Sequence, residues 1–266
     1  MGISVETVGP PDAGDRRAEV LLGVPVDAVS GPDAIGIILS WAKARASRYV
    51  IFANAHVAVT ASQDAEFASV VRLADLTLPD GAPVAWMLRK LGYRHQERVC
   101  GPDLTWDLLR HCETNGLPVY FYGSTVDTLK KLTDQVHRTY PHLVVAGTES
   151  PPFRPLTPYE NREISSRINA SGAAVVFVGL GCPKQEYWMR QQCGRVNAVM
   201  LGVGAAFDFH AGTISRAPAW MRRNSLEWLH RLTTEPKRLW RRYLVTNTLF
   251  VCGAFRRLIQ KRRNIQ

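Results

Sequence analysis

Short apolar runs alternate along the chain with longer segments in which apolar residues recur every three or four positions. The short runs are rich in β-forming residues and therefore predict strands. They lie near residues 20–24, 49–53, 76–78, 118–122, 143–146, 174–178 and 198–203. Since helix-like segments separate these strands, the pattern predicts an α/β fold with a compact, mostly parallel sheet flanked by helices.

Several of the predicted helices have recognisable start signals. Gly31-Pro32-Asp33 and Gly101-Pro102-Asp103 each precede an apolar-periodic segment, and proline followed by an acid suits a first helical turn. Ser124 is expected to cap the helix that follows the strand at 118–122. These helices would connect one strand of the sheet to the next.

The pattern changes after about residue 204. Strand-like runs stop, Arg and Trp become frequent, and Pro218 and Pro236 punctuate the helical segments. We therefore expect a flexible leader at 1–20, an α/β domain at 21–212 and a basic, aromatic-rich helical appendage at 213–266.

The net charge of +10 belongs to this appendage. Residues 216–266 hold 13 Lys and Arg against 2 acids, whereas the other 215 residues hold 20 against 21. Trp220, Trp228 and Trp240 lie among these cations. Aromatic and cationic side chains together favour a helix that lies on an anionic membrane surface. An ordinary packed helical subdomain and a nucleic-acid surface are the alternatives, and no nucleic-acid partner is expected.

Other features bear on the location of the chain. The longest apolar-rich stretch, 244–255, is shorter than the ~20 residues that a spanning helix needs, and residues 1–19 have no apolar core of a secretory signal. The five cysteines include no C-x-x-C, so neither a disulfide framework nor a zinc site is indicated. A cytosolic protein with reduced thiols is the simplest interpretation.

Three polar stretches follow predicted strands: Asn54-Ala55-His56, Pro79-Asp80-Gly81 and Gly179 to Glu186. Ligands bind outside the carboxyl ends of parallel strands, so these stretches would converge on one site. Asp80 is either an ordinary turn residue, because Pro-Asp-Gly is strong turn chemistry, or a reactive carboxylate.

The glycine loop after the strand at 174–178 has two interpretations. It is either a tight turn or an anion site, in which backbone N–H groups and a helix start would face a ligand with Lys184 and Gln185 beside them. It matches neither the dinucleotide fingerprint nor a P-loop.

No D-x-D occurs, which removes the usual carboxylate pair for a metal–diphosphate complex. We therefore expect no metal and no cofactor. If a nucleotide diphosphate is the leaving group, its charge would have to be met by cationic side chains and helix N-termini. Arg231, Arg238 and Arg241 would share a sector of roughly 80° on one continuous helix. Pro236 is also compatible with the first turn of a second helix.

Motifs in a fixed order extend over most of the chain, from about residue 21 to about residue 250. They are Asn54-Ala55-His56, Ala74-Asp75-x-x-x-Pro79-Asp80-Gly81, Arg98-Val99-x-Gly101-x-Asp103-Leu104, Tyr122-Gly123-Ser124, Gly179-x-Gly181-x-Pro183-Lys184-Gln185-Glu186, Gly202-Val203-Gly204-Ala205-Ala206-Phe207-Asp208-Phe209 with Gly212, Arg216-Ala217-Pro218, Leu226-Glu227-Trp228-x-x-Arg231-Leu232 and Glu235-Pro236-x-Arg238-x-x-Arg241-Arg242-Tyr243. Together they resemble the WecG/TagA/CpsF glycosyltransferases.

The resemblance implies a Rossmann-like α/β fold of the GT-E type and an inverting, UDP-sugar-dependent hexosyltransferase. Its donor would be UDP-N-acetylmannosamine or a related UDP-hexose. Its acceptor would be an undecaprenyl-diphosphate-linked saccharide at the inner face of the cytoplasmic membrane, in surface or exopolysaccharide synthesis. The protein would be peripheral there, and the sequence leaves a homo-oligomer open.

The resemblance also assigns roles to residues. Asp80 matches the proposed general base, and Arg98 and Gln185 match residues that line the site. Asp208 matches a nucleotide contact. The C-terminal appendage of the family is thought to close over the diphosphate. Its arginines are matched here by Arg231, Arg238 and Arg241. The further substrate-binding candidates are Asn54, Gly123, Ser124, Gly181, Lys184 and Glu186.

One position departs from the family pattern. Wall-teichoic-acid members have a threonine two residues before the matching asparagine, where this chain has Phe52. An aromatic ring in place of a hydroxyl indicates a differently shaped pocket. A UDP-glucose-dependent glucosyltransferase of exopolysaccharide assembly is therefore an alternative, and a non-catalytic membrane-peripheral scaffold is an alternative of another class.

Overall fold

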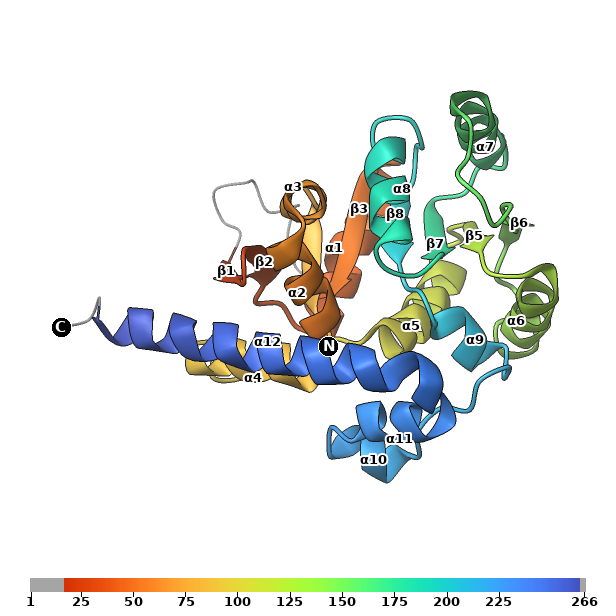
Figure 1. The fold of residues 1–266 in the computed structure, drawn as a ribbon. Helices are drawn as coiled ribbons and strands as arrows, with labels where there is room; N and C mark the ends of the chain where they lie inside the picture. Colours follow the sequence, from red (N-terminus) through yellow and green to blue (C-terminus); the bar gives the residue numbers. More distant parts are fainter. Residues whose placement is uncertain (1–16, 264–266) are drawn as a thin grey trace, which may run out of the picture.

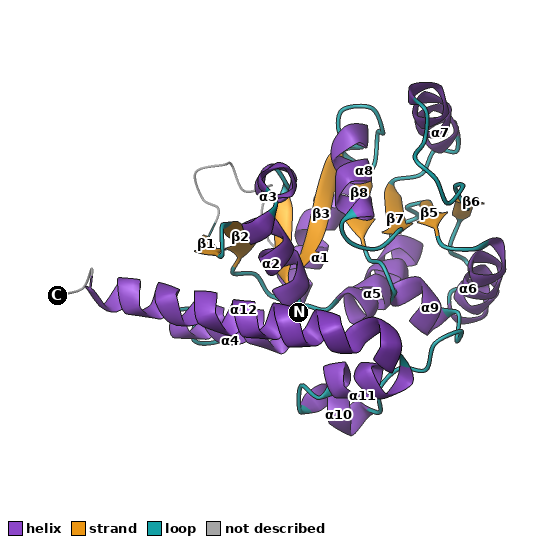
Figure 2. Cartoon of the chain, in the orientation of Figure 1, coloured by secondary structure: helices purple, strands orange, loops and turns teal. Residues whose placement is uncertain are grey.

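The computed structural model describes residues 17–263, apart from the side chains of Arg238, Arg242 and residues 260–263. Its centre is a six-stranded sheet in which every pairing is parallel, in the order β4-β3-β8-β7-β5-β6. The strands are β3 (Arg48–Ala53), β4 (Leu76–Pro79), β5 (Val119–Gly123), β6 (Val145–Glu149), β7 (Val175–Gly179) and β8 (Val199–Gly202). Helices cover both faces (Figure 1, Figure 2), which confirms the predicted fold class.

Every strand of this sheet except β4 divides its apolar side chains between two cores, because successive residues point to opposite faces of a sheet. Tyr49 and Ile51 of β3 pack into one core with α2 (Ala55–Gln63), α3 (Ala65–Arg72) and α8 (Lys184–Gln192). Val50 and Phe52 pack into the other. That second core includes α1 (Gly31–Lys43), α5 (Gly101–Thr114), α6 (Val126–Thr139) and α9 (Ala206–His210). The remaining helices of this domain are α4 (Ala82–Lys90) and α7 (Pro158–Ala170).

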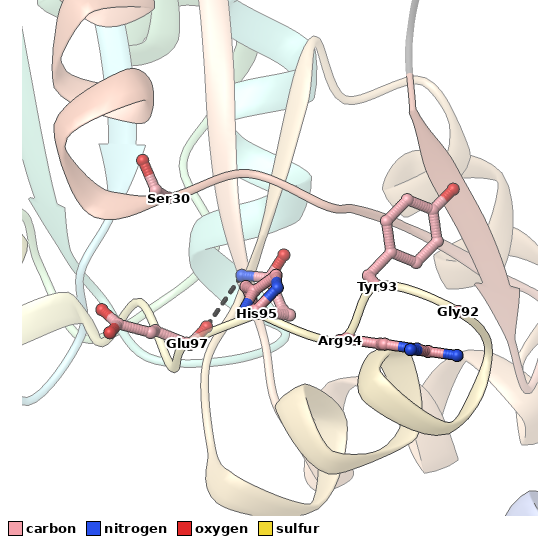
Figure 3. Close-up of a pocket in the computed structure, with 7 residues that line it drawn as sticks. Ser30, Gly92, Tyr93, Arg94, His95 and Glu97 are labelled. Atoms are coloured by element: carbon pink, nitrogen blue, oxygen red, sulfur yellow. Dashed lines mark hydrogen bonds between the residues drawn. The ribbon is translucent and has the colours of Figure 1, made fainter.

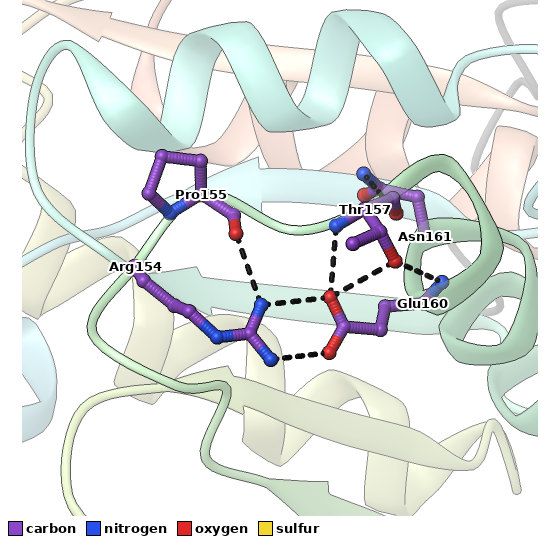
Figure 4. A network of polar contacts seen from close by, with 5 residues as sticks. All are labelled: Arg154, Pro155, Thr157, Glu160 and Asn161. Atoms are coloured by element: carbon purple, nitrogen blue, oxygen red, sulfur yellow. Dashed lines mark hydrogen bonds and ion pairs between the residues drawn. The ribbon is translucent and has the colours of Figure 1, made fainter.

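Side chains at the helix starts satisfy backbone N–H groups that have no partner inside the helix. Ser30 accepts a hydrogen bond from the N–H of Asp33 at the start of α1. Thr157 and Glu160 form a reciprocal capping box on α7, and Arg154 holds the Glu160 carboxylate at 2.6 Å (Figure 4). The expected cap at Ser124 is wrong. Thr125 caps α6, while Ser124 itself has a left-handed backbone with φ of 60°.

The N-terminal strand differs from its prediction. Residues 20–24 do not form one strand but contain the turn of a hairpin between β1 (Ala18–Leu21) and β2 (Val24–Asp27). Leu22 and Gly23 make this turn with φ of 52° and 84°. Residues 1–16 of the predicted leader lie outside the described residues, and 18–20 belong to β1. β6 begins two residues after the predicted start of its strand.

The C-terminal segment forms α10 (Ala219–Arg223), α11 (Glu227–Thr234) and the long α12 (Pro236–Arg263) (Figure 1). α12 lies against α2 and buries Phe250 and Ala254 in the same core as β3. Gly253 allows a close approach, since a Cβ there would lie 2.8 Å from the Leu22 side chain. An ion pair of 3.4 Å between Arg257 and Glu19 adds to this docking. Within residues 17–263, no helix is both long and apolar enough to cross a membrane.

Candidate active site

Asp80 and Asn54 lie side by side because they end neighbouring parallel strands. Ala53 of β3 pairs with Pro79 of β4, and the Asp80 N–H donates to the Ala53 carbonyl at 2.9 Å. The Asn54 side chain caps α2 by accepting from Val57 N at 3.1 Å, and it also hydrogen-bonds Asp80. Gly81 has φ of 91°, so it supplies the turn that follows. The turn and the candidate base are therefore compatible, and the turn presents the carboxylate at the end of the sheet.

Arg98 reaches the same place from the loop between α4 and α5. Val99 N donates to the Pro79 carbonyl at 3.0 Å, which holds this loop across the end of β4. Loss of water contact raises the pKa of Asp80 to about 6, and the negative charge of Glu227 adds to this. Arg98, the Asn54 hydrogen bond and Arg231 oppose the increase. A carboxylate with this pKa is ionised at neutral pH and is a stronger base than an ordinary aspartate.

Two segments of the appendage complete a charged cluster around Arg98. Glu227, in the first turn of α11, accepts from Arg98 Nη2 through Oε2 at 3.1 Å, and its Oε1 lies 3.8 Å from Arg216 Nε. Arg216 in turn pairs with Asp103 of α5 at 2.7 Å. All three residues belong to the motifs of the family resemblance, but no role was predicted for them. Apart from the motifs, the signal was the position of Asp103 and Glu227, each in the first turn of a helix.

Cys100 and Phe52 border this cluster. The Cys100 thiol donates to Asp103 Oδ2 at 2.8 Å, and burial raises its pKa to about 12, so it stays protonated at neutral pH. α5 begins at Gly101 between the ends of β3 and β8. A Cβ on Gly101 would lie 3.9 Å from the Phe52 ring and 3.6 Å from the Val203 carbonyl. Phe52 is thus a buried side chain directly behind the site.

Buried guanidinium groups in the cluster keep N–H donors without acceptors. In this cluster the Nε atoms of Arg216, Arg222 and Arg231 are buried and have no hydrogen-bond partner among the described residues, as is also the case for Arg257 Nε on α12. An unsatisfied buried donor on a charged group is costly, so an arrangement of this kind suits an anionic ligand. The guanidinium of Arg231 also lies over the Phe209 ring, 5.5 Å from its centre.

The three appendage arginines of the sequence analysis are divided between two helices. Arg231 lies on α11 and contributes to the charge around Asp80, whereas Arg238 and Arg241 lie on α12, which starts at Pro236. The prediction of one continuous helix is wrong, and the alternative with a second helix at Pro236 is confirmed. Arg241 is exposed. The Arg238 side chain lies outside the described part of the chain.

The glycine loop after β7 is closed by its own side chains. Gln185 Oε1 accepts from Gly181 N at 3.1 Å, and Gln185 Nε2 donates to the Gly202 carbonyl at 2.8 Å and to Glu186 at 2.9 Å. Burial raises the pKa of Glu186 to about 7. The N–H of Gly181 is therefore used within the protein, while Lys184 is exposed. Gln185 connects the start of α8 to the carboxyl end of the central strand β8.

The last predicted residues lie at neighbouring strand ends. Gly123 ends β5, and a Cβ there would lie 2.6 Å from the carbonyl carbon of Gly179. The Ser124 carbonyl accepts from the Ser150 hydroxyl at 2.7 Å. Asp208, on α9 after β8, accepts from the Thr213 hydroxyl at 3.2 Å. β8 pairs with β3, so Asp208 follows the strand next to Asn54, whereas β5 lies three strands from β3, roughly 14 Å away at the usual strand spacing.

An open pocket of about 370 Å³ lies along the loop that leads to Arg98 (Figure 3). Its lining includes Tyr93, Arg94, His95 and Glu97, with Ser30 on the far side. Gln96 stabilises the loop by donating to the carbonyls of Val29 and Glu97, both at 2.8 Å. None of the predicted site residues lines this pocket, so we place the candidate site at Asp80 and not here.

A comparison with known families decides between the classes that this geometry allows. The profile of the glycosyl transferase WecG/TagA/CpsF family matches residues 19–264. The chain belongs to the WecG/TagA/CpsF family. This match spans the appendage as well as the α/β domain, so the charged cluster between them lies inside the family unit.

Two relatives in this family carry the same name, N-acetylglucosaminyldiphosphoundecaprenol N-acetyl-beta-D-mannosaminyltransferase. One, from Bacillus spizizenii, is 33% identical over 197 residues, which is 74% of this chain and 74% of the relative. The other, from Bacillus subtilis, is 31% identical over 192 residues, covering 72% of this chain and 73% of the relative. The chain is therefore a member of a glycosyltransferase family whose relatives act on a lipid-diphosphate-linked sugar.

Proposed function

We propose that this chain is an inverting, metal-independent glycosyltransferase that moves a sugar from a UDP-sugar to an undecaprenyl-diphosphate-linked saccharide. The donor sugar is N-acetylmannosamine or a related hexose, and the product serves bacterial surface or exopolysaccharide synthesis. The observation that carries the proposal is Asp80, whose pKa of about 6 and location within reach of the charges of Arg98 and Arg231 suit a general base beside an anionic donor. The names of the two relatives support the acceptor and the sugar.

In the proposed reaction, an acceptor hydroxyl attacks the anomeric carbon of the donor from the face opposite the diphosphate. Asp80 takes the hydroxyl proton as the new C–O bond forms, and the bond to UDP breaks with its electron pair left on the diphosphate. Attack opposite the leaving group inverts the anomeric configuration. Asn54 would orient the Asp80 carboxylate through its hydrogen bond.

The departing diphosphate gains negative charge, so the site must supply positive charge without moving far. Arg98, Arg216 and Arg231 meet this need, because all three lie in the cluster around Asp80 or one ion pair away from it. The Nε donors of Arg216 and Arg231, which have no hydrogen-bond partner in the described part of the chain, would bind phosphate oxygens. This arginine set is the basis on which we propose a reaction that needs no metal.

A membrane-facing surface is part of the proposal because the acceptor is a lipid. Trp240, Leu244, Val251 and Phe255 of α12 are all exposed, at 55% to 67%. At 100° per residue they fall within a sector of roughly 60°, on a side of the helix that does not include Phe250 or Ala254. An exposed apolar stripe on a basic helix suits binding to an anionic bilayer. The active site and this surface share the appendage, so a membrane-bound acceptor would reach Asp80 from that side.

A panel assay tests the proposed function. The purified chain is incubated with UDP-N-acetylmannosamine, UDP-glucose and other UDP-hexoses, each with a synthetic undecaprenyl-diphosphate-linked N-acetylglucosamine, in the presence and absence of a chelator. We expect a single added hexose by mass, the opposite anomeric configuration from the donor, and no loss with the chelator. Transfer only from UDP-glucose would favour the glucosyltransferase alternative. No transfer from any donor, with folded protein bound to vesicles, would favour the scaffold.

A further inference from the structure

Glu227 occupies an unusual position for a carboxylate on the appendage. Its side chain is only 14% exposed, and it lies between the guanidinium groups of Arg98 and Arg216, which come from two other segments. The helix that carries it, α11, also supplies Arg231 to the neighbourhood of Asp80. Glu227 is therefore the negative charge through which the appendage holds a basic residue of the α/β domain.

The contacts of Arg98 show why this matters for geometry. Arg98 lies on a loop and not on a helix or strand, so its guanidinium depends on side-chain contacts for its direction. Its guanidinium donates a hydrogen bond to Glu227 at 3.1 Å, while Asp80 acts on it through charge. The Arg98 side chain is 21% exposed, so it is not held by burial alone. Glu227 fixes the end of the side chain that faces the candidate base.

The rest of the cluster fixes Glu227 in its turn. Arg216 lies 3.8 Å from the second carboxylate oxygen and is itself held by Asp103 at 2.7 Å. Asp103 also lies 3.6 Å from Arg222 of α10. The signs alternate from Asp80 through Arg98, Glu227 and Arg216 to Asp103. A fixed order of this kind joins the base to both short helices of the appendage.

We propose that Glu227 is a positioning residue of the transfer reaction, which holds Arg98 beside Asp80 when the appendage is docked. The inference rests on the proposed function, in which Asp80 is the base. It goes further because the charges around Asp80, and so its pKa, would depend on the docked appendage. Glu227 itself touches neither the sugar nor the diphosphate in this role.

The test uses the full-length chain with Glu227→Gln and Glu227→Asp. Glu227→Gln keeps the shape and removes the charge, so we expect kcat to fall roughly 10- to 100-fold, because small misplacements of a catalytic group cost this much. KM for the UDP-sugar should change little. Glu227→Asp keeps the charge and should recover part of the lost rate.

A pH profile separates this role from a purely structural one. The groups that face Asp80 are Arg98 from its loop, Glu227 and Arg231 from α11, Asn54 from α2, and the neutral thiol of Cys100. Arg98 lowers the pKa of Asp80 by more than Glu227 raises it, so release of Arg98 in Glu227→Gln should move the acidic limb of kcat/KM to higher pH. A shift to lower pH would mean that only the charge of Glu227 was lost while Arg98 stayed in place, which contradicts the positioning role. Loss of stability alone would reduce the rate without moving that limb.

Glu160→Gln is the matched control. It also removes the charge of a carboxylate paired with an arginine, at 2.6 Å from Arg154, but on α7, and glutamine can still close the capping box (Figure 4). We expect normal kcat and an unmoved pH limb in this variant. An unchanged kcat and an unmoved limb in Glu227→Gln would overturn the inference while Asp80→Asn remains inactive. Full activity in Asp80→Asn would instead overturn the proposed function.

Discussion

Replacement of Asp80 by asparagine should stabilise the fold while it removes the base. Loss of water contact, with Glu227 adding to it, raises the pKa of Asp80 from 3.8 to about 6 against the opposing effects of Arg98, Asn54 and Arg231. The folded chain therefore holds this proton more tightly than the unfolded chain. The associated stability is fully present below about pH 4 and is lost as the pH rises through about 6. At neutral pH the ionised Asp80 thus destabilises the protein relative to a neutral amide.

The size of the effect follows from the two pKa values. A difference between 3.8 and about 6 corresponds to at most about 3 kcal/mol at pH 7 or above. Asp80 keeps some solvent contact, so we expect about 2 kcal/mol. In a chain of this size that raises Tm by roughly 4 to 8 °C. The gain should shrink as the pH falls below about 6 and vanish below about pH 4, where Asp80 is neutral in both the folded and the unfolded chain.

Thermal unfolding of the full-length wild type and Asp80→Asn at about pH 5 and about pH 8 measures this difference. Asp134→Asn is the control, since it makes the same change at an exposed position on α6. We expect the Tm gain of Asp80→Asn to be full at about pH 8 and reduced to roughly half to two-thirds of that at about pH 5, where Asp80 of the unfolded chain is still ionised. A Tm equal to or below the wild type at both pH values would refute the assignment of a raised pKa to Asp80.

Three further predictions concern the appendage. Arg231→Ala should weaken UDP binding, measured by calorimetry, roughly 10- to 100-fold, because a charge-assisted hydrogen bond is lost. The control Arg256→Ala, at an exposed position, should bind UDP normally. Equal binding by both variants would show that Arg231 is not part of the donor site. Leu244→Asp should reduce recovery on vesicles that contain phosphatidylglycerol without lowering Tm, since Leu244 is 63% exposed; unchanged recovery would exclude this face of α12 as the membrane contact. Phe250→Ala should cost about 3 to 5 kcal/mol of unfolding free energy in urea, because the ring is buried between α12 and the domain; a negligible cost would mean that α12 is not docked as described.

The sheet could be predicted from the sequence because all of its strands except β6 are largely buried and read as short apolar runs. The strand ends then followed from the parallel order, which places Asn54 and Asp80 at one edge. The hairpin at residues 18–27 was missed because its turn consists of Leu22 and Gly23, and leucine at a positive φ gives no turn signal. Ser124 failed as a cap for a similar reason, since its backbone is left-handed and the next residue takes the role.

The charged cluster could not be derived from local patterns. Glu227 and Asp103 look like ordinary acids in first helical turns, which favour the helix dipole wherever they occur. Their pairing with Arg98 and Arg216 depends on how the appendage docks, and that docking depends on contacts such as Gly253 against Leu22, far apart in sequence. For Gln185 the structure adds contacts that the sequence did not indicate, because its amide hydrogen-bonds Gly181 and Gly202. Its predicted role toward a ligand stays a prediction.

The most direct test of the account is sugar transfer by Asp80→Asn protein. Initial rates are measured with the UDP-sugar that the wild type uses and a lipid-diphosphate-linked acceptor, on protein whose unfolding transition shows that it is folded. We predict a loss of roughly 10²- to 10⁴-fold, the usual contribution of a general base, together with unimpaired binding of UDP. A rate close to that of the wild type would contradict the central claim that Asp80 accepts the proton of the attacking hydroxyl.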